Sequence, residues 1–129
     1  MPTVLIVEDD ADLRWMIRTA IGSAGYRVTE ASNGPDALRT LETDRTDLII
    51  LDLDLPIING HAVRAELASQ AELRDIPVVL ITGGPTMEMT VPVECLLRKP
   101  FSPEGLILTV RRCMKPVSRR PSPNDRART

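Results

Sequence analysis

The sequence contains few aromatic residues and no long hydrophobic run. Trp15, Tyr26 and Phe101 are its only aromatic residues, so a hydrophobic core must be built from Leu, Ile, Val and Ala. No stretch approaches the ~20 apolar residues of a transmembrane helix. The N-terminus also lacks the basic and then apolar pattern of a signal peptide. We therefore expect a cytoplasmic protein that makes no use of a membrane.

Cysteine and histidine are nearly absent. Cys95 falls in a predicted strand, Cys113 in a predicted helix, and the only histidine is His61. No spacing among them is typical of a zinc site. In an intracellular protein, two such cysteines are expected to be small buried apolar residues.

The positive charge is concentrated at the C-terminal end. Residues 1–110 have 9 basic and 17 acidic side chains, whereas residues 111–129 have seven basic side chains and a single acid, Asp125. An acidic folded part is a poor candidate for direct nucleic-acid binding. The basic end contains Pro and Ser and few apolar residues, which predicts a disordered tail over residues 116–129. Solvation alone explains such a tail, and docking to an anionic partner is the alternative.

Short apolar runs alternate with helical periodicity in the rest of the chain, and 129 residues predict one domain. The predicted strands are 3–7, 27–31, 48–51, 78–81 and 95–98. The predicted helices are 11–24, 35–43, 60–70 and one that opens at Ser102-Pro103-Glu104. Residues 83–94 leave room only for a short crossover. This alternation predicts an α/β fold with a doubly wound, parallel, five-stranded sheet.

Reactive side chains follow four of the predicted strands. Glu8 and Asp9 follow the first strand, Asp52 the third, Thr82 the fourth and Lys99 the fifth. The carboxyl ends of parallel strands meet at one edge of the sheet, where open α/β sheets bind their ligands. Clustered carboxylates favour Mg²⁺, which would remove their mutual repulsion and neutralise an incoming phosphoryl group. Individually, each residue could be a helix cap, a strand end or a turn, so it is the shared position that makes the set specific.

Four motifs contain these residues. They are Val4-Leu-Ile-Val-Glu8-Asp9-Asp10, Asp52-Leu-Asp-Leu-Pro56-Ile-Ile-Asn-Gly60, Ile81-Thr82-Gly83 and Lys99-Pro100-Phe101. In this order and spacing, the chain resembles the receiver domain of bacterial two-component response regulators. The resemblance implies a receiver domain over residues 1–115, with a flavodoxin-like three-layer sandwich and strand order 2-1-3-4-5.

The resemblance also implies roles for the site residues. Asp52 would accept a phosphoryl group from a sensor histidine kinase or a histidine phosphotransfer protein. The metal, Mg²⁺ or Mn²⁺, would be bound by Glu8, Asp9, Asp52 and the backbone carbonyl of Asp54. Thr82 would be the switch hydroxyl and Lys99 the charge partner of the phosphoryl group. Two further expectations concern residues next to the site: Asp10 would cap the first helix, and the Lys99-Pro100 bond would be cis.

The resemblance implies output by phosphorylation-dependent protein–protein contact, without direct nucleic-acid binding. It implies no enzymatic activity beyond self-phosphorylation and self-dephosphorylation. Three departures from the family pattern affect the output: Gly83 replaces the usual Ala, the crossover before Lys99 is short, and Leu96 replaces the usual switch aromatic. We therefore expect signalling through a different surface or through loop ordering. Trp15, off the apolar stripe of its helix, is either a docking anchor or an ordinary exposed residue.

Two other functions fit part of the pattern. A receiver that has lost phosphorylation could act by binding alone, although the intact set of site residues argues against this. Asp52-Leu-Asp54 also resembles the nucleophile motif of haloacid-dehalogenase-type phosphatases. In that family, however, the acidic pair follows the lysine, whereas here it precedes Asp52. The chain could also be part of a longer regulator.

Overall fold

The computed structural model describes residues 1–53, 65–66, 69–70, 73, 75–83 and 95–114. Several predictions lie outside these residues. They concern the backbone carbonyl of Asp54, most of the helix at 60–70, the crossover after Gly83 and the tail at 116–129. Within the described part of the chain, no helix is long and apolar enough to cross a membrane.

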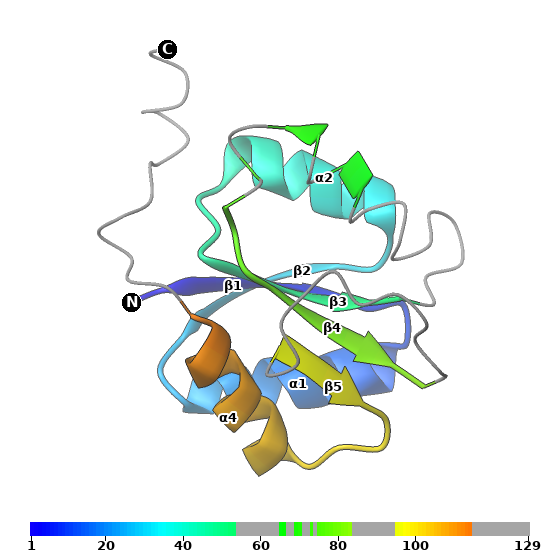
Figure 1. Ribbon diagram of the computed structural model, residues 1–129, viewed down its shortest axis with the longest axis vertical. Helices are drawn as coiled ribbons and strands as arrows, with labels where there is room; N and C mark the ends of the chain where they lie inside the picture. The colour runs from blue at the N-terminus through cyan, green and yellow to red at the C-terminus, as the bar shows by residue number, and fades with distance from the viewer. Residues whose placement is uncertain (54–64, 67–68, 71–72, 74, 84–94, 115–129) are drawn as a thin grey trace.

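Five parallel strands form one sheet, and its order is β2-β1-β3-β4-β5 (Figure 1). The strands are β1 (Thr3–Val7), β2 (Arg27–Ala31), β3 (Leu48–Asp52), β4 (Val78–Thr82) and β5 (Leu96–Arg98). The helices are α1 (Ala11–Ser23), α2 (Gly34–Thr43) and α4 (Pro103–Cys113). The parallel, doubly wound sheet and the strand order implied by the resemblance are both confirmed.

Helices cover both faces of the sheet, with α2 on one face and α1 and α4 on the other (Figure 1). Successive residues of a strand point to opposite faces. Leu5 therefore packs in the cluster on the α2 side, and Ile6 packs in the cluster on the side of α1 and α4. Because both faces are covered, β1 and β3 are buried throughout, which explains their continuous apolar sequences.

Side-chain caps set the first residues of the three helices. Asp10 accepts hydrogen bonds from the backbone of α1, as predicted. Asn33 caps α2 in the same way, and Ser102 caps α4 just before Pro103. These caps satisfy amide groups that have no partner inside the helix. Gly25, after α1, has a φ of 98°, a conformation that favours glycine and turns the chain towards β2.

The cysteines are buried as predicted, but they are not separate thiols. Cys95 and Cys113 are joined by a disulfide, with their Cα atoms 5.8 Å apart. The prediction of small buried apolar residues holds for their burial but did not include this bond. The pairing arises because the start of β5 packs beside the C-terminal end of α4, a proximity that spacing along the chain does not reveal.

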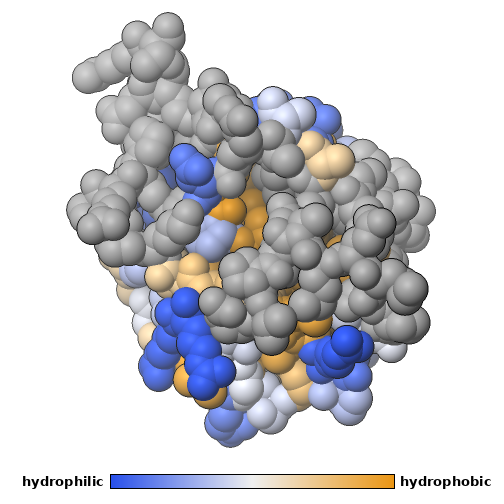
Figure 2. All heavy atoms as spheres, viewed as in Figure 1, coloured by the Kyte–Doolittle hydropathy of each residue, from blue (hydrophilic) through white to orange (hydrophobic). Residues whose placement is uncertain are grey.

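Hydrophobic side chains remain visible on the face that Figure 2 shows, between strongly hydrophilic ones. Of the large hydrophobic residues described, Met1, Trp15 and Leu108 are exposed. Trp15 on α1 is 58% exposed, in agreement with its position off the apolar stripe. Its use as a docking anchor stays a prediction.

Candidate functional site

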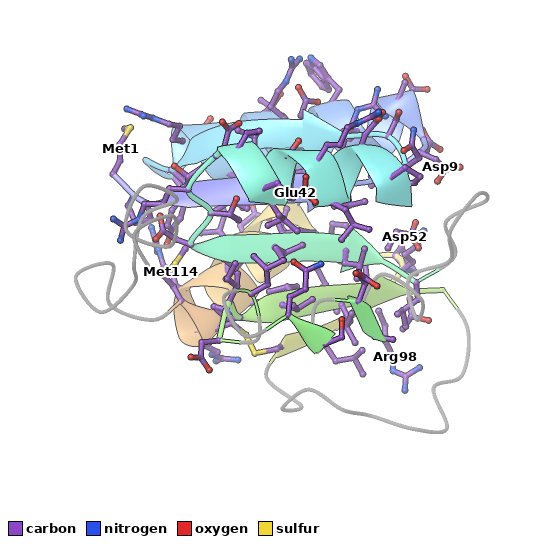
Figure 3. All side chains as sticks on the ribbon, turned by 90° about the horizontal axis from the view of Figure 1, so that it is seen from above. Met1, Asp9, Glu42, Asp52, Arg98 and Met114 are labelled. Atoms are coloured by element: carbon purple, nitrogen blue, oxygen red, sulfur yellow. A yellow bond between two sulfur atoms is a disulfide. The ribbon has the colours of Figure 1, made fainter. Side chains whose placement is uncertain are left out.

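Three carboxyl groups meet at the carboxyl edge of the sheet. Figure 3 shows Asp9 and Asp52 at this edge, together with Arg98 at the end of β5. The β1–β3 register pairs Val7 with Leu51, so Glu8 and Asp52 follow neighbouring residues of adjacent strands. One ligand oxygen from each of Glu8, Asp9 and Asp52 lies within 4.8 Å of the other two. The predicted acidic cluster therefore forms.

Lys99 reaches this cluster from β5. Its Nζ donates a hydrogen bond to Asp52 Oδ2 at 2.9 Å. Its backbone N–H donates to the carbonyl of Thr82 at 2.9 Å, which fixes the lysine beside the end of β4. Asp52 is only 2% exposed, so its carboxylate is held in a site where water screens the ion pair weakly. The Lys99-Pro100 bond is cis, as the resemblance implied.

Thr82 is the last residue of β4 and is buried. The β3–β4 register pairs Asp52 with Ile81, which places Thr82 one residue further along the neighbouring strand. The next residue, Gly83, would place an added Cβ at an ordinary contact distance of 3.8 Å from Lys99 Cδ. The structure thus brings together the predicted residues of the described part of the site.

Glu8 has a buried carboxyl group, and one of its two oxygens has no hydrogen-bond partner among the described residues. Its Oε1 accepts a hydrogen bond from the Asp10 amide at 3.1 Å, whereas Oε2 has no partner among the described residues. Burial and then the nearby Asp52 carboxyl together raise the pKa of Glu8 to about 8, although the Asp10 amide and Lys99 act in the opposite direction. The two carboxyl groups can hydrogen-bond only by sharing a proton. An uncompensated oxygen in a group of three carboxylates fits a hard divalent cation.

Arg14 was missed by the sequence interpretation. Its Nη1 donates to the backbone carbonyl of Glu8 at 2.8 Å, and its Nε lies 3.4 Å from Oε1 of Glu30. Arg14 therefore ties the turn after β1 to β2 and fixes the backbone that presents the acidic pair. Its position six residues after Glu8 gave no local signal of this contact.

Divalent-cation binding is expected to become stronger with pH and to release a proton. At pH values below its pKa of about 8, Glu8 carries a proton that it must lose before it can bind a cation. Isothermal titration calorimetry in two buffers of different ionisation enthalpy should show release of about 0.9 proton per Mg²⁺ at pH 7, and about 0.1 at pH 9.

The control for this prediction is Glu8→Gln, which has no proton to release and should bind Mg²⁺ weakly at both pH values. Equal proton release by the wild type at pH 7 and pH 9 would contradict the raised pKa. The raised pKa of Glu8 has the opposite effect on the stability of the metal-free protein, which decreases as the pH rises. The unfolded chain loses the Glu8 proton near the ordinary glutamate pKa of 4.5, so this group's contribution to stability falls as the pH rises from there to about 8.

A scan of protein-family models matches residues 4–111 to the response regulator receiver domain. The chain belongs to this family. The structure also resembles that of the chemotaxis protein CheY4 of Vibrio cholerae, with a TM-score of 0.80, 28% identity and coverage of 88% of this chain and 99% of that one. The family assignment favours the receiver over the phosphatase alternative and makes this a domain of two-component signalling.

Two further relatives bear on the function. The chain is 34% identical to the phosphate regulon transcriptional regulatory protein PhoB of Pseudomonas aeruginosa, over 95% of this chain and 54% of that protein. It thus spans about half the length of this regulator. The receiver domain of a sensor histidine kinase from Pseudomonas aeruginosa PAO1 matches with a TM-score of 0.77, 28% identity and coverage of 87% and 96%. That structure has a magnesium ion coordinated in its active site cleft. Because transcriptional regulators are among the relatives, the expectation that nucleic acid is not a partner is not supported.

Proposed function

We propose that the chain accepts a phosphoryl group on Asp52 from the phosphohistidine of a sensor histidine kinase or a histidine phosphotransfer protein. The observation that carries the proposal is the buried Asp52 carboxylate, with Lys99 Nζ at 2.9 Å and the carboxylates of Glu8 and Asp9 beside it. Receiver domains use histidine kinases as their phosphodonors, which agrees with this direction of transfer.

Mg²⁺ is the proposed cofactor. Glu8, Asp9 and Asp52 would bind the ion, together with the backbone carbonyl of Asp54 that the family resemblance implies. When bound, the ion neutralises charge on the phosphoryl group and relieves the repulsion among the carboxylates. The unpartnered Glu8 Oε2 supports a ligand role for this residue.

Asp52 forms a new O–P bond as the P–N bond to the donor histidine breaks, and that imidazole keeps the bonding electron pair and takes up a proton. Lys99 Nζ, which donates to Asp52 at rest, transfers its hydrogen bond to a phosphoryl oxygen. Thr82 can donate its hydroxyl hydrogen to another of these oxygens. Hydrolysis of the acyl phosphate by water then resets the domain. The chain promotes both steps on itself and has no other enzymatic activity in this proposal.

The proposed output is contact with another protein in the cytoplasm. Leu96 stands where the family usually has its switch aromatic, and it packs, half-buried, against the hydrophobic cluster on the α2 side. A leucine in this packing has no ring or hydroxyl to expose when Thr82 moves. This supports an output that depends on another surface.

Intact-mass spectrometry after incubation with acetyl phosphate tests the proposal. We expect one phosphoryl group per chain in the presence of Mg²⁺ and none when the metal is chelated. Hydroxylamine should remove the group, because it cleaves acyl phosphates and leaves phosphoserine intact. The absence of any addition, both from acetyl phosphate and from a phosphorylated histidine kinase, would favour the receiver that acts by binding alone.

A further inference from the structure

The two ends of β5 carry two different reactive groups. Cys95 immediately precedes Leu96–Arg98, and Lys99 immediately follows. Lys99 joins the acidic cluster at the carboxyl edge of the sheet. The disulfide partner Cys113 is the last residue of α4, next to Met114, which Figure 3 shows at the end of the molecule opposite Asp52 and Arg98. β5 thus runs from the disulfide to the phosphorylation site.

Among the described residues, β5 is a short strand at one side of the sheet. It contains three residues, lies at the edge of the described sheet and pairs only with β4 there. Its residues are half-buried or exposed, whereas all five residues of β4 are buried. Short edge strands with few buried contacts open more readily than the centre of a sheet. A covalent bond at its N-terminal end therefore restrains a segment whose C-terminal end positions Lys99.

The disulfide is buried, so its reduction is expected to change the packing of the core and not only the chemistry of the surface. Cys95 and Cys113 are 6% and 7% exposed, and both belong to the hydrophobic cluster between the sheet and α1 and α4. The bond closes the segment from Cys95 to Cys113, which contains β5, Lys99, the cis-Pro100 bond and all of α4. Both thiols remain after reduction, but β5 and α4 then stay together only through non-covalent contacts.

We propose that Cys95 and Cys113 form a reversible redox site that controls phosphorylation of Asp52 through β5. This inference rests on the proposed function for its effect on phosphorylation. In the oxidised protein the disulfide holds β5 against α4 and keeps Lys99 beside Asp52. In the reduced protein β5 opens more often, and the domain accepts a phosphoryl group more slowly.

The chemistry is thiol–disulfide exchange with a low-molecular-mass disulfide of the glutathione type. One cysteine thiolate attacks this disulfide and releases one thiol. The second cysteine thiolate then attacks the mixed disulfide, forms the Cys95–Cys113 bond and releases the second thiol. Two cysteine thiols are thereby oxidised and one small disulfide is reduced to two thiols. Where the compartment keeps thiols reduced, protein disulfides are usually transient and regulatory, as this proposal requires.

Two features favour exchange at Cys113. It ends α4, and the last turn of a helix frays more easily than its middle. The exposed Arg111 and Arg112 lie in the same turn. Their positive charge attracts anionic thiol compounds such as glutathione.

The first part of the test asks whether the bond forms and what it restrains. Protein incubated with glutathione disulfide should lose both free thiols, measured as resistance to iodoacetamide by intact mass, and dithiothreitol should restore them. Reduction should lower the melting temperature by about 10 °C. It should also speed hydrogen–deuterium exchange at the Lys99 amide, which donates to Thr82, at least threefold.

The second part measures phosphorylation from acetyl phosphate with Mg²⁺ in both redox states. We expect the oxidised wild type to react at least threefold faster than the reduced one. The Cys95→Ala/Cys113→Ala variant should match the reduced rate under both conditions. The single Cys113→Ala variant, which also cannot form the disulfide, should give the same rate and controls for a folding defect of the double variant.

The outcomes separate this proposal from the proposed function. Two free thiols after treatment with glutathione disulfide would overturn the redox site, as would equal Lys99 exchange in the two states. Equal phosphorylation rates in the two states would also overturn it. No phosphorylation in either state, together with a redox-dependent exchange of the Lys99 amide, would overturn the proposed function and the control of Asp52 but leave the redox restraint of β5 in place.

Discussion

Asp52→Asn is expected to abolish phosphoryl incorporation, with a fall of at least ~1,000-fold in rate from acetyl phosphate. Asparagine has nearly the same shape as aspartate, but its neutral amide oxygen is a poor nucleophile. It also removes one charge from the group that Glu8 and Asp9 form with it. Intact-mass spectrometry over a time course, with Mg²⁺ present, measures the effect directly. A circular dichroism spectrum like that of the wild type would confirm that the variant is folded.

The matched control is Asp44→Asn, which makes the same chemical change at an exposed residue at the end of α2, outside the site. This variant should be phosphorylated as fast as the wild type. Incorporation into Asp52→Asn at the wild-type rate would show that another residue accepts the phosphoryl group. In that case, the partly buried ion pair between Asp52 and Lys99 would be a structural feature of the domain rather than part of its chemistry.

The fold could be predicted because its signals are local. A strand covered on both faces is apolar at every position, and the sequences of β1, β3 and β4 read in this way. The observed bounds differ from the predicted ones by one residue at one end of β3, β4, β5, α1 and α2. Ser102 and Pro103 predicted the start of α4 because a side-chain acceptor and a residue without an N–H suit the two first positions of a helix. Strand order required the resemblance, since periodicity does not say which strands are neighbours.

The residues of the candidate site and the edge of the sheet where they meet could be predicted, but the contacts among their side chains could not. Which oxygens lie close together, and which one lacks a partner, depends on side-chain packing around Glu8. The contact from Arg14 to the Glu8 carbonyl crosses from α1 to the turn after β1 and leaves no pattern in the sequence. The disulfide escaped prediction for the same reason, because Cys95 and Cys113 meet only after β5 and α4 have packed.

Ile50→Ala is expected to destabilise the domain by about 3–4 kcal/mol and to lower its melting temperature by roughly 10–15 °C. Ile50 is fully buried on β3, the central strand. It is paired with Ile6 of β1 on one side and Val79 of β4 on the other, and the three side chains belong to the same hydrophobic cluster. Removing three carbon atoms leaves a cavity that neighbouring strands cannot close without breaking their ladders. Urea unfolding and thermal melts measure the loss.

Leu108→Ala is the matched control, because Leu108 on α4 is 47% exposed and should cost less than about 1 kcal/mol. Well below the melting temperature, Ile50→Ala should still be phosphorylated, since hydrogen bonds along β3 fix the backbone of Asp52. Among them, the amide of Leu53 donates to the carbonyl of Ile81 at 3.0 Å. Equal destabilisation by the two substitutions would mean that the paired side chains of Ile6, Ile50 and Val79 do not form the core of the fold. A folded Ile50→Ala that cannot be phosphorylated would mean that side-chain packing behind β3, and not the strand ladder alone, holds Asp52 in its reactive position.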